Sequence, residues 1–225
     1  MISVRTVSKT FRRRDVLRDV SMAFEPGRVV GLSGPNGSGK TMLMRIVSGL
    51  VKPTSGSVEV DGRTVGTDIP FPPSLGLLLE GPAFINGYSG FDNLKALASI
   101  RDTLTDDDIR SWIGRVGLDP ADRRHYRRYS LGMKQRLGIA AALMESPDVV
   151  MLDEPTNALD AEGVRMVRRE VGAARARGAA VVLACHDAGV LRDLSDEIWY
   201  LAEGHIDGHE VLTARDDGEE VRDGR

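Results

Sequence analysis

Short runs of alternating apolar and polar residues fill the first part of the chain, and this two-residue period is typical of half-buried β-strands. Strands are expected at residues 2–11, 16–24 and 28–33. Pro26 and Gly27 provide the break before the third strand. Residues 55–65 continue the alternation around Asp61-Gly62, a pair that favours a tight hairpin turn. The pattern therefore predicts an antiparallel β subdomain near the N-terminus.

Longer apolar patterns in the rest of the chain alternate between helices and continuous buried strands. Helices are expected at residues 40–51, 90–102, 105–118, 131–145 and 161–178. Buried strands are expected at residues 75–79, 148–153 and 179–185. Strands that alternate with helices predict an α/β fold with a mainly parallel, doubly wound sheet. We expect one domain over residues 1–212, with a helical insert at about 89–145, and a charged, loosely held tail at 213–225.

The first of these helices, at residues 40–51, has a predicted apolar face. Its members are Met42, Leu43, Ile46 and Leu50. Gly49 and Pro53 are expected to stop the helix.

A glycine-rich stretch, GPNGSGKT, lies between the third strand and this helix. It fits the phosphate-binding motif G-x-x-x-x-G-K-[ST], whose glycines let backbone N–H groups turn toward an anion at a helix start. The lysine supplies a charge for the β- and γ-phosphates, and the threonine supplies a hydroxyl ligand for Mg²⁺. The predicted ligand-binding residues are Gly34, Pro35, Asn36, Gly37, Ser38, Gly39, Lys40 and Thr41. The stretch predicts the phosphate cradle of a P-loop NTPase core, with Mg²⁺ as the metal; the alternative is a glycine-rich turn with an incidental lysine.

Two adjacent carboxylates, Asp153 and Glu154, end the apolar run at 148–153. Ligands of open α/β sheets bind at the carboxyl ends of the strands, so Asp153 can hold Mg²⁺ there. Glu154 can orient or deprotonate an attacking water, which makes an ATPase the leading interpretation. Ordinary turn chemistry for the Asp-Glu-Pro sequence is the alternative.

A second helix start, at Ser130, also has two interpretations. Gly132 lies in the first turn of this helix, so exposed N–H groups and the Ser130 hydroxyl are available to an anion. A simple helix cap accounts for the local sequence equally well.

The order of these motifs resembles the ATP-binding subunits of ABC transporters, and the likeness covers nearly the whole chain. The motifs are the phosphate loop, SLGMKQR at 130–136, MLDEP at 151–155, NALD at 157–160 and the histidine at 186. In that family two such domains pair head to tail around two ATP molecules. The resemblance implies that Ser130 and Gly132 act on the γ-phosphate held by the partner subunit.

The same resemblance assigns roles to single residues. It implies that Asp153 serves the metal, that Glu154 serves the water, and that His186 contacts the γ-phosphate. It also implies that Asp160 makes a dimer contact and that Phe11 stacks on adenine. A structural, hydrogen-bonded His186 and a Phe11 buried in the core remain the alternatives.

Two departures from the family pattern concern the metal and the signature. Glu80 stands where the family usually has a glutamine that touches metal and water, so an oxygen ligand survives with an added negative charge. Met133 replaces the second glycine of the signature, and Lys134 follows it. Both changes are similar to the exporter branch that includes bacitracin-resistance and lantibiotic-immunity ATPases, and on that resemblance we expect export.

Composition and charge exclude several partners. The net charge of -3 gives no overall attraction to nucleic acid or anionic lipid. The basic run at 123–130 is short and isolated and is interpreted as a solvated loop or a surface that touches nucleotide or partner domains, so no nucleic-acid partner is expected. The start of the chain has no apolar signal segment, and no apolar run approaches the ~18 residues of a spanning helix. The single cysteine, Cys185, excludes an internal disulfide and is interpreted as a small apolar strand residue rather than a thiol catalyst or a metal ligand.

These observations predict an ATPase subunit that powers transport through a separate membrane-spanning permease. It is expected to pair as a homodimer or with another ABC ATPase, and to be cytoplasmic and peripheral on the inner face of the membrane. A soluble ABC-type ATPase that acts on DNA or ribosomes is the alternative, although the long coiled-coil insert or second ATPase domain of such proteins does not occur in the sequence. A P-loop GTPase or kinase is disfavoured because no N-K-x-D guanine motif is present.

Overall fold

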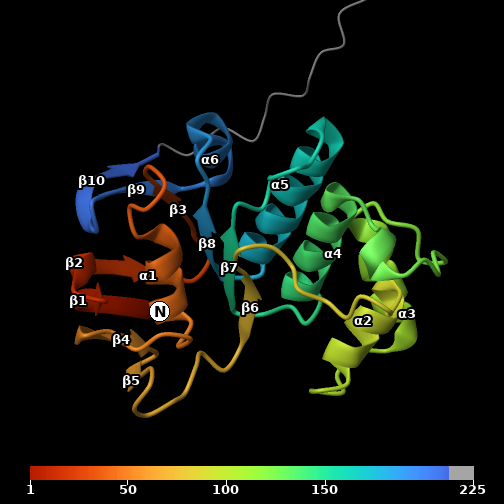
Figure 1. Cartoon of the computed structure of the whole chain (residues 1–225), viewed down its shortest axis with the longest axis horizontal. Helices are drawn as coiled ribbons and strands as arrows, with labels where there is room; N and C mark the ends of the chain where they lie inside the picture. Colours follow the sequence, from red (N-terminus) through yellow and green to blue (C-terminus); the bar gives the residue numbers. More distant parts are fainter. Residues whose placement is uncertain (213–225) are drawn as a thin grey trace, which may run out of the picture.

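Two β-sheets lie side by side in the computed structural model, which describes residues 1–212 (Figure 1). The tail predicted at 213–225 lies outside the described residues. The first sheet has the order β2-β1-β4-β5, and all its neighbouring strands are antiparallel. Its strands are β1 (Ile2–Phe11), β2 (Arg14–Phe24), β4 (Ser55–Val60) and β5 (Arg63–Thr64). Asp61 (φ 49°) and Gly62 (φ 77°) both have positive φ between β4 and β5, which confirms the predicted tight hairpin.

The second sheet has the order β10-β9-β3-β8-β7-β6. All of its pairs are parallel except β9 with the edge strand β10. Its strands are β3 (Val29–Ser33), β6 (Leu75–Leu78), β7 (Val149–Asp153), β8 (Ala180–Ala184), β9 (Glu197–Ala202) and β10 (His205–Val211). Residues of β3, β7 and β8 are almost entirely buried because elements cover both faces of the sheet. The mainly parallel α/β fold predicted from the sequence is confirmed.

Helices cover the parallel sheet on one side, and the antiparallel sheet with α1 covers the other (Figure 1). The helices are α1 (Lys40–Val47), α2 (Gly90–Ala98), α3 (Asp106–Arg115), α4 (Leu131–Leu143), α5 (Ala161–Ala176) and α6 (Ala188–Leu194), with a 3-10 turn at Tyr126–Arg128. Thr105 and Ser130 cap α3 and α4 through their side chains, as predicted.

The prediction that Leu50 lies on the apolar face of the first helix is wrong. That helix ends at Val47, and Gly49 follows with a φ of 82°, a left-handed conformation that turns the chain away. Leu50 is therefore 64% exposed. The elements after residue 186 were not predicted, because α6 has only seven residues and β9 mixes charged, aromatic and apolar residues without a clean period.

Helix α4 joins the helical insert to the core. Its buried residues Leu137 and Ile139 belong to the same apolar cluster as Leu78 of β6, Leu94 of α2 and Ile109 of α3. Helix α4 has apolar residues on all sides, because one side packs on β6 and β7 of the sheet and the other packs on α2 and α3. The start of α4, at Ser130, is thereby fixed relative to the ends of the parallel strands.

Candidate nucleotide site

The glycine-rich loop joins β3 to α1 at the carboxyl end of the parallel sheet. Gly34 and Gly39 have φ values of 147° and 108°. A Cβ on Gly34 would lie 2.1 Å from the carbonyl oxygen of Leu201, and one on Gly39 would lie 2.6 Å from a methyl group of Leu17. Both positions therefore require glycine, for conformation and for space. The N-cap of α1 has no side-chain hydrogen bond, so the N–H groups of its first turn are available to a ligand.

Lys40 is held above this loop. Its Nζ donates hydrogen bonds to the carbonyl oxygens of Gly34, at 2.6 Å, and Pro35, at 3.1 Å. The side chain is buried, and the buried hydroxyl of Ser38 has no hydrogen-bond partner within residues 1–212. The loop thus concentrates a positive charge and unused donors, which is the chemistry that a polyphosphate requires.

Thr41 and Asp153 meet across the loop, although 112 residues separate them in sequence. The Thr41 hydroxyl donates to Asp153 Oδ2 at 2.7 Å. Burial raises the pKa of the Asp153 carboxyl, while the hydrogen bond from Thr41 opposes this shift and the adjacent Glu154 charge adds to it. The Thr41 hydroxyl and the Asp153 carboxylate are hard oxygen ligands that fit a Mg²⁺ ion. Because the carboxylate is buried and its charge is only partly compensated, a bound Mg²⁺ would relieve the free-energy cost of burying that charge.

Glu80, the third predicted metal ligand, is engaged elsewhere. Its Oε2 accepts a hydrogen bond from Arg45 of α1 at 2.5 Å, and its side chain is 59% exposed. Glu80 lines the same cavity as Asp153, and its charge contributes to the raised pKa of that residue. Arg45 was not among the predicted site residues. Its position four residues after Thr41, on the same face of the helix, could have indicated that it lies near the metal ligands.

Glu154 and His186 form a second pair at the neighbouring strand ends. His186 Nδ1 lies 2.7 Å from Glu154 Oε2. The backbone N–H of Glu154 donates to Ala184 of β8 at 2.8 Å, and Gln135 Nε2 of α4 donates to the Glu154 carbonyl at 2.9 Å. These bonds fix the backbone of Glu154, which has a positive φ of 49°. The structure therefore brings together the two residues predicted to act on water and γ-phosphate.

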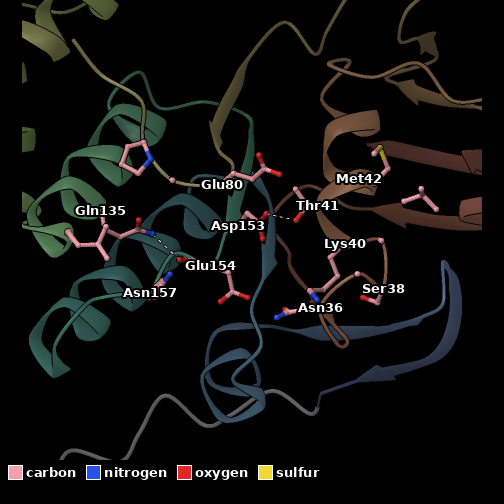
Figure 2. Close-up of a pocket in the computed structure, with 16 residues that line it drawn as sticks. Asn36, Ser38, Lys40, Thr41, Met42, Glu80, Gln135, Asp153, Glu154 and Asn157 are labelled. Atoms are coloured by element: carbon pink, nitrogen blue, oxygen red, sulfur yellow. Dashed lines mark hydrogen bonds between the residues drawn. The ribbon is translucent and has the colours of Figure 1, made fainter. Parts of the chain in front are cut away.

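One cavity of about 520 Å³ contains most of the predicted site. Figure 2 shows Lys40, Thr41 and Asn36 on the phosphate-loop side, with Glu154, Gln135 and Asn157 facing them from the other side. The cavity is also lined by Val16, Gly37, Ser38, Gly39, Met42, Glu80, Gly81, Pro82, Leu131 and Asp153. Gln135 and Asn157 belong to the SLGMKQR and NALD motifs, but neither was among the predicted site residues, and both contribute amide groups to the cavity.

Phe11, predicted to stack on adenine, does not line this cavity. It ends β1 and is 55% exposed, with the guanidinium of Arg12 5.5 Å from its ring centroid. The alternative of a core aromatic is therefore wrong, and adenine stacking stays a prediction. Val16, on the following strand, lines the cavity instead.

The residues predicted to act in trans lie outside the cavity and have roles within the chain. Ser130 Oγ accepts a hydrogen bond from the N–H of Met133 at 3.2 Å and is exposed. A Cβ on Gly132 would lie 2.8 Å from the carbonyl oxygen of Ala158. Asp160 caps α5 through Gly163 N–H at 2.8 Å; this bond, with the nearby guanidinium of Arg136, lowers the pKa of Asp160.

Similarity to known proteins agrees with this geometry. Residues 17–157 match the family model described as ABC transporter. The chain belongs to the ABC transporter ATP-binding family. It is accordingly an ATPase of the ABC type, and its nucleotide is ATP.

Among the relatives, an uncharacterized ABC transporter ATP-binding protein, YybJ of Bacillus subtilis, is 40% identical over 96% of this chain and 100% of its own length. The lantibiotic transport ATP-binding protein SrtF of Streptococcus pyogenes is 34% identical over 98% of this chain and 93% of its own. The bacitracin transport ATP-binding protein BcrA of Enterococcus faecalis is 32% identical over 92% of this chain and 68% of its own. The names of SrtF and BcrA match the branch that the sequence motifs resemble.

Solved ABC structures share the fold. A dimeric ATP-binding cassette in a post-hydrolysis state, bound to ADP and Pi, has a TM-score of 0.86 and 23% identity over 96% of this chain and all of its own. A bacterial Atm1-family ABC exporter with ATP bound has a TM-score of 0.81 and 22% identity over 93% of this chain and 38% of its own. Across residues 1–212, every helix is too short or too polar to cross a bilayer.

Proposed function

We propose that this ABC ATPase powers export through a separate membrane-spanning permease, to which it binds at the inner face of the membrane. The observation that carries the proposal is the cavity in which Lys40, the Thr41–Asp153 pair and Glu154 face one another. Such an arrangement can bind a nucleoside triphosphate and hydrolyse it, so the protein can supply free energy to a partner.

Binding of ATP begins at the phosphate loop in this proposal. The N–H groups at the start of α1 and the ammonium of Lys40 hold the β- and γ-phosphates, and Lys40 exchanges its two loop carbonyls for phosphate oxygens. Thr41 and Asp153 hold Mg²⁺, with Glu80 as a further oxygen ligand once it leaves Arg45. When bound, Mg²⁺ supplies positive charge that neutralises the triphosphate.

Hydrolysis is assigned to Glu154 and His186. The carboxylate of Glu154 orients a water molecule and accepts its proton as the water attacks the γ-phosphate. His186 holds that carboxylate through the 2.7 Å contact of its Nδ1, and its exposed ring is free to turn toward the γ-phosphate. The proton acceptor and the phosphate cradle belong to one chain, at the ends of β7 and β3, which both pair with β8 in one sheet.

A second ATPase subunit is proposed to complete the site. Ser130 and Gly132 do not line the cavity of their own chain, and Ser130 is exposed at a helix N-terminus, where it suits an anion. The similar cassette bound to ADP and Pi is dimeric, which supports a pairing of this kind. Closure of the pair on ATP and its reopening after hydrolysis would then move the permease.

The transport role is supported by the names of the lantibiotic and bacitracin transport ATP-binding relatives, and export rests on the resemblance of Glu80 and Met133 to the exporter branch. The test is to purify the tagged chain from membranes of its native host and identify what co-purifies. A membrane-spanning protein is expected to co-purify in stoichiometric amount. In vesicles reconstituted with both proteins, ATP is expected to drive its substrate across the membrane, away from the side that corresponds to the cytoplasm. Recovery of ribosomes or DNA with no membrane protein would contradict the proposal, and uptake toward the cytoplasmic side would contradict export alone.

A further inference from the structure

A second group of metal-binding side chains lies beside the proposed magnesium ligands. Glu154, Cys185 and His186 each offer one ligand atom, and these atoms lie within 4.8 Å of one another. Within residues 1–212 this is the one group of three or more His, Cys, Asp and Glu side chains with such spacing. Thr41 and Asp153 present oxygen alone, whereas this group presents oxygen, sulfur and nitrogen.

We propose that Glu154, Cys185 and His186 form a binding site for a zinc-like divalent metal ion, and that its occupation stops ATP hydrolysis. Thiolate and imidazole ligands select borderline and soft ions such as Zn²⁺ over Mg²⁺, which prefers an all-oxygen shell. A site of one thiolate, one carboxylate and one neutral imidazole balances the two charges of the ion and leaves a fourth position for water.

The protein backbone places these three ligands without help from a metal. Glu154 follows β7 and Cys185 follows β8, two parallel strands paired through Asp153 and Ala184. The N–H of Glu154 donates to the carbonyl of Ala184 at 2.8 Å, which fixes the two strand ends against each other. Ligand atoms around tetrahedral zinc are about 3.3–3.7 Å apart, so side-chain rotations that move the three ligand atoms by roughly 1 Å are enough to form the site.

Access and surroundings suit a metal that enters from solvent past His186 and Glu154. The side chain of His186 is 70% exposed and that of Glu154 is 30% exposed, while Cys185 is buried behind them. Burial raises the pKa of the Cys185 thiol, so binding must release its proton to solvent. The Thr156 hydroxyl lies 3.8 Å from Cys185 Sγ and can support the thiolate as a hydrogen-bond donor.

Inhibition follows from the shared residue and rests on the role proposed above for Glu154. A carboxylate that ligates zinc can no longer accept the proton of the attacking water, and His186 is withdrawn with it. Cys185 has no part in the proposed hydrolysis, so its replacement separates the metal site from the ATPase site.

Binding is tested first with Co²⁺ alone, added to the purified full-length protein without nucleotide. The near-ultraviolet charge-transfer band of a cobalt–thiolate bond is expected in the wild type and absent in Cys185→Ser. His209→Ala is the matched control, since His209 Nε2 also contacts a carboxylate, Glu197, at 2.6 Å but has no neighbouring thiol. This control should keep the band; no band in the wild type, or an unchanged band in Cys185→Ser, would overturn the site.

Inhibition is tested by titrating Zn²⁺ into the protein as it hydrolyses ATP with Mg²⁺ in excess. Cys185→Ser should keep the turnover of the wild type without zinc and need at least about tenfold more Zn²⁺ for half-inhibition. Equal sensitivity of the two proteins would overturn the proposal; Cys185→Ala repeats the comparison if the serine variant unfolds. A cysteine-dependent cobalt band with zinc-insensitive hydrolysis would keep the metal site and overturn the role of Glu154.

Discussion

The phosphate loop and the start of α4 are both helix N-termini that fit an anion, yet the chain treats them differently. At the phosphate loop, Lys40, Thr41 and Asp153 converge in one cavity. At α4, the Ser130 hydroxyl is exposed, and that cavity receives Leu131 and Gln135 instead. One region therefore has the groups of a nearly complete binding site, whereas the other is proposed to meet its ligand only when a second subunit brings it.

The difference between the phosphate loop and the start of α4 indicates which step of the proposed cycle a conformational change can control. A cradle built within one rigid sheet can bind nucleotide at all times, but hydrolysis that waits for a second surface is tied to the approach of that surface. Variants of the two regions should therefore fail in different ways.

The largest effect is expected for Glu154→Gln. Glutamine keeps the size of the side chain but cannot accept the proton of water, so ATP turnover should fall by about 10² or more. Nucleotide binding should persist, and the ATP-bound protein should accumulate as a dimer in size-exclusion chromatography. Glu162→Gln, an exposed carboxylate in the first turn of α5, is the control and should hydrolyse normally. Undiminished turnover in Glu154→Gln would remove that residue from its proposed role.

The next largest effect is expected for Ser130→Ala. Loss of the hydroxyl should lower turnover by roughly 10–100-fold while ATP binding to the dilute subunit is unchanged. It also removes a helix cap worth about 1 kcal/mol. Thr105→Ala controls for this, because Thr105 also caps its helix, α3, through its hydroxyl, with an additional capping-box bond to Asp108. If the two variants lose stability and activity equally, Ser130 is a cap alone and the proposed trans site is wrong.

A smaller effect is expected for Phe11→Ala. Stacking of an aromatic ring on a base is worth about 1 kcal/mol or more, so the dissociation constant of ATP should rise about fivefold. Phe71→Ala removes an equally exposed ring, at 58% against 55%, and should not change it. Fluorescence titration with a nucleotide analogue measures both. Equal ATP affinities in the two variants would show that Phe11 does not stack on adenine, and would leave the apolar side chain of Val16 as the proposed contact of the base.

The smallest effect concerns stability and pH in Asp153→Asn. A carboxyl whose pKa is higher in the folded than in the unfolded protein destabilises the fold when it is charged, above the folded pKa, and this penalty vanishes as the pH falls below the unfolded value. The variant should therefore be more stable than the wild type at neutral pH, and the gain should shrink in acid. Thermal unfolding without nucleotide over a pH series measures it; a destabilised variant at neutral pH would contradict the pKa shift.

Local sequence patterns predicted most of the fold, and within the site they predicted the phosphate loop and the Asp153–Glu154 pair. The strands through β8, the caps Thr105 and Ser130, and the parallel sheet all follow from periodicity and short-range chemistry. Leu50 shows the limit of periodicity, since a left-handed Gly49 ended the helix before the apolar pattern did. The short α6 and the partly buried β9 gave no clear signal.

The sequence by itself predicted phosphate binding at residues 34–41, because the conformation of a glycine-rich loop before a helix is a local property. It also determined the family through the order of its motifs. Only the tertiary structure decided that Arg45 holds Glu80, that Gln135 reaches Glu154, and that Cys185 joins a carboxylate and an imidazole. Those contacts depend on the register of parallel strands and the position of α4, which packing over long sequence distances fixes and no local pattern encodes.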